Sequence, residues 1–332
     1  FREAIGFVAD HAKAREALGF TREDGKWVSP EDRAAAEEMK KQVAGAEEGE
    51  EVKDETPEEK AIGSPLVKRR TKHFLIQSAL GDASVKECAK LAETVFKDFH
   101  EFLELSPDTP VVKESIGGVM LLNEEQHKKY VDSFVEGSDG LKEFYRKGGG
   151  QWDPSPPRFE GWKTGDDAGI LDMVVHMSVH VLFHDYMAEG ANNVAPWLYE
   201  SMGYTFTVRL RQSALTHCIT SGTGGGGKEG MPFDAGRWKE ATRASVQKGV
   251  DPPMPRMLGA TINSIQGDLL LKGWSMLDWM QATRKPKLLE FFAELKHAPE
   301  GVDGQISAWK KAFGQTPEES EKEWRDWVRA NY

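Results

Sequence analysis

The chain has 332 residues, with 54 acidic and 43 basic side chains and a formal net charge of −11 at pH 7. Hydrophobic residues make up 39% of it and ten residues are tryptophan, which is enough apolar material for a folded core. The acidic balance argues against nucleic acid as a partner, because phosphate binding requires clustered Lys and Arg. No apolar run approaches the roughly 20 residues that span a bilayer, so we expect no membrane span.

The first 44 residues are predicted to form a small helix–hairpin–helix module. Residues 1–18 have a helical composition, and Asp24-Gly25 favours a tight turn between two short strands. Ser29 followed by Pro30 is typical of the start of a second helix. The chain begins at Phe1 instead of Met, which is compatible with the removal of a signal segment and an extracytoplasmic location.

Residues 45–64 are rich in acidic side chains, with seven Glu and one Asp against two Lys. Such a segment cannot bury enough apolar area to offset the entropy lost on ordering, so we expect a solvated acidic linker. An acidic docking tail for a basic partner is the alternative. The short basic run at 68–72 is interpreted as a solvated face where the linker meets the domain.

The main domain is predicted to cover residues 65–332. Strand patterns at 73–78 and 116–122 enclose an amphipathic helix that contains Cys88 at an apolar position. We expect a buried thiol there, and a disulfide with Cys218 stays open. Asn123 should cap the next helix with Gln126 reaching back, and residues 148–157 should form an irregular loop.

Nearly everything after residue 157 has a helical pattern, and the tryptophans at 274, 279, 309, 324 and 327 fall at helical spacings typical of a core. Strands first and helices afterwards indicate the α+β class. We therefore expect a small N-terminal strand-containing subdomain followed by a mainly helical domain.

Three histidines lie one helical turn apart on the helix predicted at 168–189. His176 and His180 share one face, whereas His176 and His184 are separated by a rise of about 12 Å. One ion therefore cannot bind all three, and the pair is either 176/180 or 180/184. Glu200 favours the first pair, because the turn at 192–196 lets the next helix fold back across it. Two imidazoles and a carboxylate are a usual ligand set of catalytic zinc.

The segment from Val175 to His180, followed by Pro196 to Glu200, resembles the site of the gluzincin metallopeptidases, which are thermolysin-like enzymes of the peptidase-MA group. That family has His-Glu-x-x-His and a third-ligand Glu in a Trp-Leu-x-Glu-Gly context. The resemblance extends roughly from residue 70 to 330 and implies a zincin-like fold. It also implies zinc bound by His176, His180 and Glu200.

Two positions depart from the family pattern. Met177 replaces the glutamate that accepts a proton from zinc-bound water in the family, and Ser201 replaces the usual glycine after the third ligand. Loss of a general base costs about 10²–10⁴-fold in rate. Tyr199 and Tyr204 flank the third ligand and are auxiliary candidates, but a phenol is a poor base near neutral pH.

The leading hypothesis is therefore a zinc-binding, catalytically impaired pseudopeptidase that holds a peptide or protein in its cleft. An active zinc metallopeptidase hydrolase with a base relocated to Glu229 or Asp234 is one alternative, and a metal-free structural or interaction protein is the other. The glycine-rich run at 222–228 resembles a phosphate-binding loop, but Glu229 stands where a magnesium-binding Ser or Thr belongs. Substrate, partner and oligomeric state are not predicted.

Overall fold

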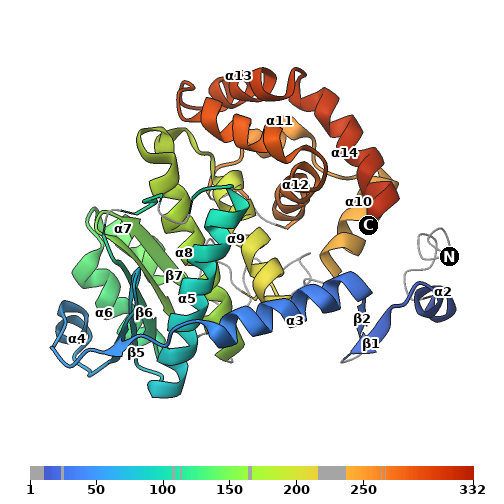
Figure 1. The fold of residues 1–332 in the computed structure, drawn as a ribbon. Helices are drawn as coiled ribbons and strands as arrows, with labels where there is room; N and C mark the ends of the chain where they lie inside the picture. The colour runs from blue at the N-terminus through green and yellow to red at the C-terminus, as the bar shows by residue number, and fades with distance from the viewer. Residues whose placement is uncertain are drawn as a thin grey trace.

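The computed structural model describes residues 11–23, 26–106, 109–112, 114–163, 167–215, 237–262, 264–265 and 267–332. Within these ranges a six-stranded mixed sheet has helices on both faces, and a larger group of helices lies beside it (Figure 1). The α+β class is thereby confirmed. The zincin-like architecture and the division into module, linker and domain stay predictions.

The sheet has the strand order β3-β4-β5-β6-β8-β7. Strands β5, β6 and β8 run parallel, whereas β4 and β7 are antiparallel to their neighbours. Strand β7 is the last in this order and is therefore an edge strand. The bounds are β3 (Glu50–Glu51), β4 (Val67–Arg70), β5 (Phe74–Ser78), β6 (Ile116–Leu121), β7 (Gly150–Pro154) and β8 (Pro157–Trp162).

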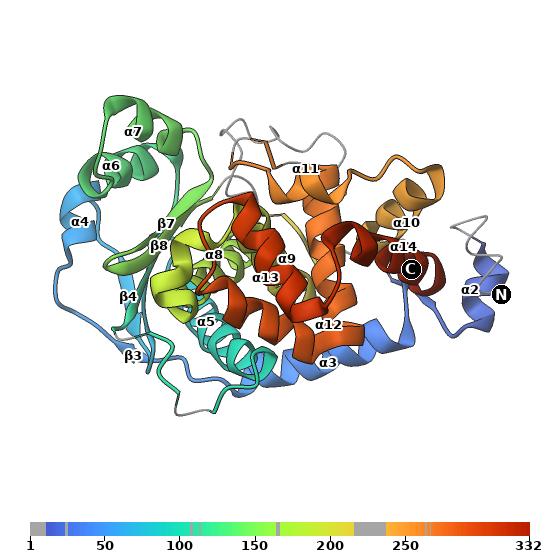
Figure 2. The ribbon, with the colours of Figure 1, turned by 90° about the horizontal axis from the view of Figure 1, so that it is seen from above.

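Two long helices, α5 (Asp82–Phe102) and α8 (Asp167–Met187), pack against one face of this sheet and against each other. The other face is covered by α6 (Glu124–Phe134). Helices α4 (Pro57–Ile62) and α7 (Asp139–Arg146) both pack against α6 (Figure 2). Helix α5 forms as its apolar spacing predicts, and Cys88 is buried on its inner face. Cys218 lies outside the described residues.

Asn123 caps α6 as expected, since its side chain accepts from the N–H of Gln126 at 3.0 Å. The return contact differs from the expected capping box, because Oε1 of Gln126 accepts from the N–H of Leu122. The same end of α6 is therefore tied to the end of β6, one residue before the cap.

The C-terminal part is helical. Helix α12 contacts α9 and α13, and four of the five tryptophans predicted to be core, at 274, 279, 309 and 324, are buried, while Trp327 is partly buried. The elements are the 3-10 helix η1 (Ala188–Asn193), α9 (Pro196–Arg211), α10 (Trp238–Lys248), α11 (Met254–Leu258), α12 (Asp268–Leu295), α13 (Val302–Phe313) and α14 (Pro317–Asn331).

The N-terminal residues form α2 (Ala12–Ala17), β1 (Thr21–Glu23), β2 (Lys26–Val28) and α3 (Pro30–Gly45). The two strands pair antiparallel and confirm the hairpin, although Asp24 and Gly25 themselves lie outside the described residues. Helix α3 then runs along α5 and α9 (Figure 2).

Three segments differ from what the sequence led us to expect. Residues 45–64 are more ordered than expected, since they contain β3 and α4, and Glu59 is buried and paired with Lys68, because a capping box at Thr56 starts the helix and β3 joins the sheet. The basic run at 68–72 begins inside strand β4 and is a solvated face only in part, because Arg70 and Lys72 are exposed whereas Lys68 is buried. The irregular loop at 148–157 forms strand β7 and the start of β8, because an edge strand tolerates proline.

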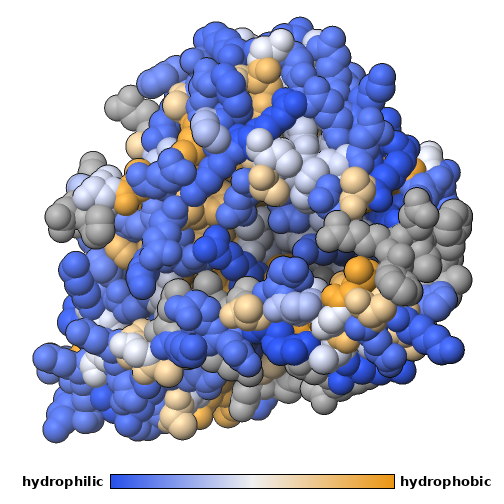
Figure 3. Space-filling view, turned by 45° about the vertical axis from the view of Figure 1, so that its right-hand side comes forward, coloured by the Kyte–Doolittle hydropathy of each residue, from blue (hydrophilic) through white to orange (hydrophobic). Residues whose placement is uncertain are grey.

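Within the described ranges, every helix is too short or too polar to span a bilayer. The face drawn in Figure 3 is mostly hydrophilic, with hydrophobic residues scattered singly or in small groups. Scattered apolar residues of this kind are normal on a protein surface.

Candidate metal centre

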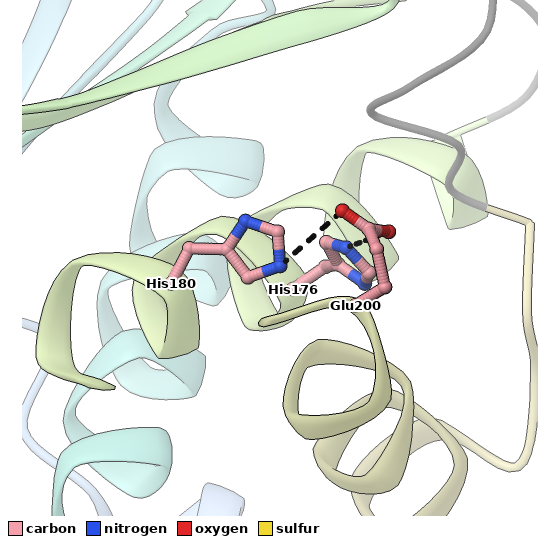
Figure 4. A group of neighbouring side chains, drawn as sticks. All are labelled: His176, His180 and Glu200. Atoms are coloured by element: carbon pink, nitrogen blue, oxygen red, sulfur yellow. Dashed lines mark ion pairs between the residues drawn. The ribbon is translucent and has the colours of Figure 1, made fainter. Parts of the chain in front are cut away.

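His176, His180 and Glu200 converge at the interface of α8 and α9 (Figure 4). The two histidines lie one turn apart on α8, and Glu200 lies in the second turn of α9, which begins at Pro196. All three are at most 1% exposed, and one ligand atom from each lies within 4.8 Å of the others. The structure therefore brings together the three residues predicted as ligands.

The carboxylate of Glu200 lies between the two imidazoles. Its Oε2 is 3.3 Å from Nε2 of His176, and its Oε1 is 3.8 Å from Nε2 of His180. The second distance is too long for a hydrogen bond. Burial lowers the pKa of both histidines to about 3, so both imidazoles are neutral at pH 7 and each keeps a lone pair for a cation.

Gly203, one turn after Glu200, lies against the ring of His176. A Cβ at this position would come within 2.7 Å of Nδ1 and Cε1 of the imidazole, so only glycine fits without movement. Tyr204 packs edge-on against the same ring at a centroid distance of 4.7 Å and is buried. The auxiliary candidate Tyr204 is thus next to the site, and its catalytic role stays a prediction.

The position of the family's general base is apolar. Met177 is fully buried and belongs to the hydrophobic core. The neighbouring phenol of Tyr199 does not replace the base, because burial raises its pKa above the usual range. Glu229 and Asp234, the proposed sites of a relocated base, lie outside the described residues, as does the glycine-rich run at 222–228.

The second departure from the family pattern is accommodated by α12. Ser201 is buried and donates a 2.6 Å hydrogen bond to the carbonyl oxygen of Trp197. Gly273 of α12 packs directly onto it, since a Cβ on Gly273 would lie 2.3 Å from the Ser201 Oγ. The volume added on α9 is therefore matched by a glycine on the facing helix.

Trp152 of the edge strand β7 reaches the site from the sheet. Its ring lies 5.7 Å from that of His180, 5.7 Å from that of His184 and 5.3 Å from that of Tyr199. His184 itself is directed to Asp185 at 3.4 Å and is not in the ligand group. Sequence reasoning missed Trp152 because residues 148–157 were expected to be a loop.

Asp172 lies on α8, one turn before His176, and its carboxylate binds the end of α9 and the residues just after it. Its carboxylate accepts from the Ser213 hydroxyl at 2.6 Å, from the Leu215 N–H at 2.9 Å and from Nε of Arg211 at 3.3 Å. Burial raises its pKa against the opposing effect of these bonds. The sequence analysis did not single out Asp172. The presence of an acid in an otherwise apolar helix could have marked it as a buried, bonded carboxylate, but its partners depend on the fold.

Comparison with known proteins gives no family assignment, because the chain matches no protein-family model and no curated protein sequence matches it significantly.

Proposed function

We propose that this chain is a zinc-binding, peptidase-like protein of the gluzincin type that has lost its general base and is catalytically weak or inert. The observation that carries the proposal is the convergence of His176, His180 and Glu200 in one buried group. Their order along the chain, two histidines four apart and a glutamate on the following helix, agrees with the family pattern.

The donor set fits zinc. Zn–N and Zn–O bonds of about 2.0–2.2 Å in a tetrahedral arrangement place neighbouring ligand atoms roughly 3.4 Å apart. The 3.3 Å between Nε2 of His176 and Oε2 of Glu200 is close to this spacing, whereas Nε2 of His180 is 3.8 Å from the other oxygen, and the whole group lies within 4.8 Å, so the ligands would draw together around an ion. Neutral imidazoles are the form that binds a metal, and burial keeps both neutral.

Zinc, when bound, would supply a Lewis acid that polarises a carbonyl and lowers the pKa of a water. The residues of this chain would hold the ion but offer no carboxylate at position 177, where a buried thioether can neither accept nor return a proton. The chain would therefore bind the ion but would lack the base at position 177 that hydrolysis requires.

Metal analysis of protein purified without chelator tests the first part of the proposal. We expect about one zinc per chain, and less than about 0.2 would contradict metal binding altogether. A peptidase assay on the zinc-loaded protein tests the second part. Activity at the level of an ordinary zinc peptidase would favour the alternative of a relocated base.

The substitution Met177→Glu tests the family assignment. It restores a carboxylate at the base position, and we expect hydrolysis of a generic peptide substrate to rise by about 10²-fold or more. Met177→Gln is the matched control, because it adds a polar side chain of the same size without a base. No gain in a folded, zinc-loaded Met177→Glu protein would mean that the rest of the cleft is not that of a peptidase.

A further inference from the structure

A concave surface lies at the edge of the sheet that the β7–β8 hairpin forms, and Trp152, which packs against His180, is one of its lining residues. It is a groove with a volume of about 400 Å³, and its walls come from α6, α7 and the β7–β8 hairpin. This volume falls in the range of about 300–1,000 Å³ that ligand sites occupy. Half of the lining residues are aromatic or proline, among them Phe134, Tyr145, Pro154 and Pro156, and the others include the charged residues Glu136, Asp153 and Arg158.

Helix α7 leaves its apolar side uncovered. None of its residues is buried, and Leu141 and Phe144 are 41% and 40% exposed. They are two of only five large hydrophobic residues that are exposed in the described ranges. Leu141 and Tyr145 line the groove directly, so the apolar side of α7 continues into it. Exposed apolar surface that joins a concave site is typical of a binding surface.

The charges of the groove leave one acid uncompensated. Arg158 is satisfied within the protein, because its Nη2 donates to Asp153 at 3.2 Å and to the carbonyl oxygen of Phe134 at 3.1 Å. Glu136 also lines the groove, but no ion pair joins it to any described residue. The groove therefore presents an apolar wall beside a negative charge.

The groove is held in shape by a buried ion pair beneath it. Nδ1 of His127 on α6 lies 2.9 Å from the carboxylate of Glu160 on β8, and Nε2 of the same ring lies 2.9 Å from the carbonyl oxygen of Tyr145 on α7. His127 and Glu160 are both completely buried. One imidazole thus ties both helices to the sheet, and such preorganisation reduces the entropic cost of binding.

We propose that this groove binds an extended peptide segment of a partner protein in which large apolar side chains stand beside Lys or Arg. The apolar side chains would enter between Leu141, Phe134 and the prolines of the hairpin, and the basic side chain would pair with Glu136. The proposal does not require a bound metal, because none of the three ligand residues lines the groove, and Trp152, which lines it and packs against His180, is not a ligand.

Fluorescence anisotropy with the labelled hexapeptide Ser-Leu-Phe-Lys-Arg-Ser tests the proposal on the full chain. We expect it to bind at least about tenfold more tightly than either Ser-Ser-Ser-Lys-Arg-Ser or Ser-Leu-Phe-Glu-Glu-Ser. Leu141→Ala should weaken binding about fivefold or more, and Glu136→Gln about two- to fivefold. The binding should be the same with and without a chelator.

Two matched variants serve as controls. Val250→Ala removes apolar surface from an exposed residue outside the groove, and Glu300→Gln neutralises an exposed acid outside it. Both should bind like the wild type, and all four proteins should unfold at similar temperatures. Equal binding of the three peptides, absence of binding, or equal losses in the groove and control variants would overturn the proposal. Self-association in sedimentation experiments that Leu141→Ala abolishes would also overturn it, because the groove would then bind a second copy of the chain.

Discussion

Gly203 of α9 touches the imidazole of His176 on α8, and the space that its missing side chain leaves is filled by that ring. The same two helices carry the three residues of the candidate metal centre. The position of the His176 ring is therefore set by helix packing as much as by Glu200, and a change at position 203 should disturb the centre without touching a ligand.

Gly203→Ala should lower the free energy of unfolding by about 1–3 kcal/mol, because the new methyl group overlaps the His176 ring. It should also lower zinc stoichiometry by displacing Nε2. Gly169→Ala is the matched control, since it lies on α8 with nothing near a new Cβ, and it should be neutral or stabilise by about 1 kcal/mol. Urea unfolding and metal analysis of both variants measure this, and equal behaviour would contradict the packing argument.

His180→Ala should abolish zinc binding, because it removes one of three ligands. His184→Ala, one turn further along α8, should keep the wild-type stoichiometry, since His184 does not belong to the ligand group. Zinc should also raise the melting temperature of wild type and His184→Ala but not of His180→Ala; at 100 times Kd the stabilisation is about 2.7 kcal/mol. Retained zinc in His180→Ala would refute the ligand assignment.

Local patterns in the sequence predicted helices α5, α8 and α9 and the burial of the tryptophans, because apolar period and caps depend on neighbours along the chain. The meeting of His176, His180 and Glu200 followed from helical spacing together with one turn. The features that could not be predicted depend on contacts between residues that are far apart in the sequence or on strand pairing. Glu59 is buried because Lys68 pairs with it, and Trp152 reaches His180 because β7 joins β8.

The pH dependence of stability should carry a contribution from Asp98. This carboxylate on α5 is buried, and burial raises its pKa to about 6, although Arg209 on α9 lies 2.7 Å away and opposes the shift. An acid whose pKa is higher in the folded than in the unfolded protein stabilises the fold at low pH, and this stabilisation is lost as the pH rises through about 6.

We therefore expect wild type to gain about 2 kcal/mol relative to Asp98→Asn when the pH falls from 7 to 4, because the loss of stability begins near the unfolded pKa of about 3.9 and is complete above the folded pKa of about 6. Asp82→Asn on the same helix is the control. Hydrogen bonds from Lys86 and Arg69 lower the pKa of Asp82, so its effect should be weak and of opposite sign. Urea unfolding across this range measures both differences, and a difference between wild type and Asp98→Asn that does not change with pH would contradict the expectation.

Removing one member of the buried His127–Glu160 pair should lower the free energy of unfolding strongly, whereas replacing both members with apolar residues should lower it much less. Both ring nitrogens of His127 face acceptors, an arrangement that favours the imidazolium form. Burial lowers the pKa of His127, but the Glu160 carboxylate and the bonds to Glu160 and Tyr145 outweigh this and raise it, while burial raises the pKa of Glu160 as well. His127→Leu leaves the Glu160 carboxylate buried without its cation and should cost about 3–5 kcal/mol.

The double variant His127→Leu, Glu160→Leu should recover most of that loss, because two apolar side chains of similar volume remove both buried charges together. The Tyr145 carbonyl still loses its donor, so recovery should fall short by about 1–3 kcal/mol. Urea unfolding of the wild type, both single variants and the double variant gives the coupling energy between the two residues. Additive single losses would show that the pair does not act as one unit, and the groove formed by α6 and α7 would then need another source of rigidity.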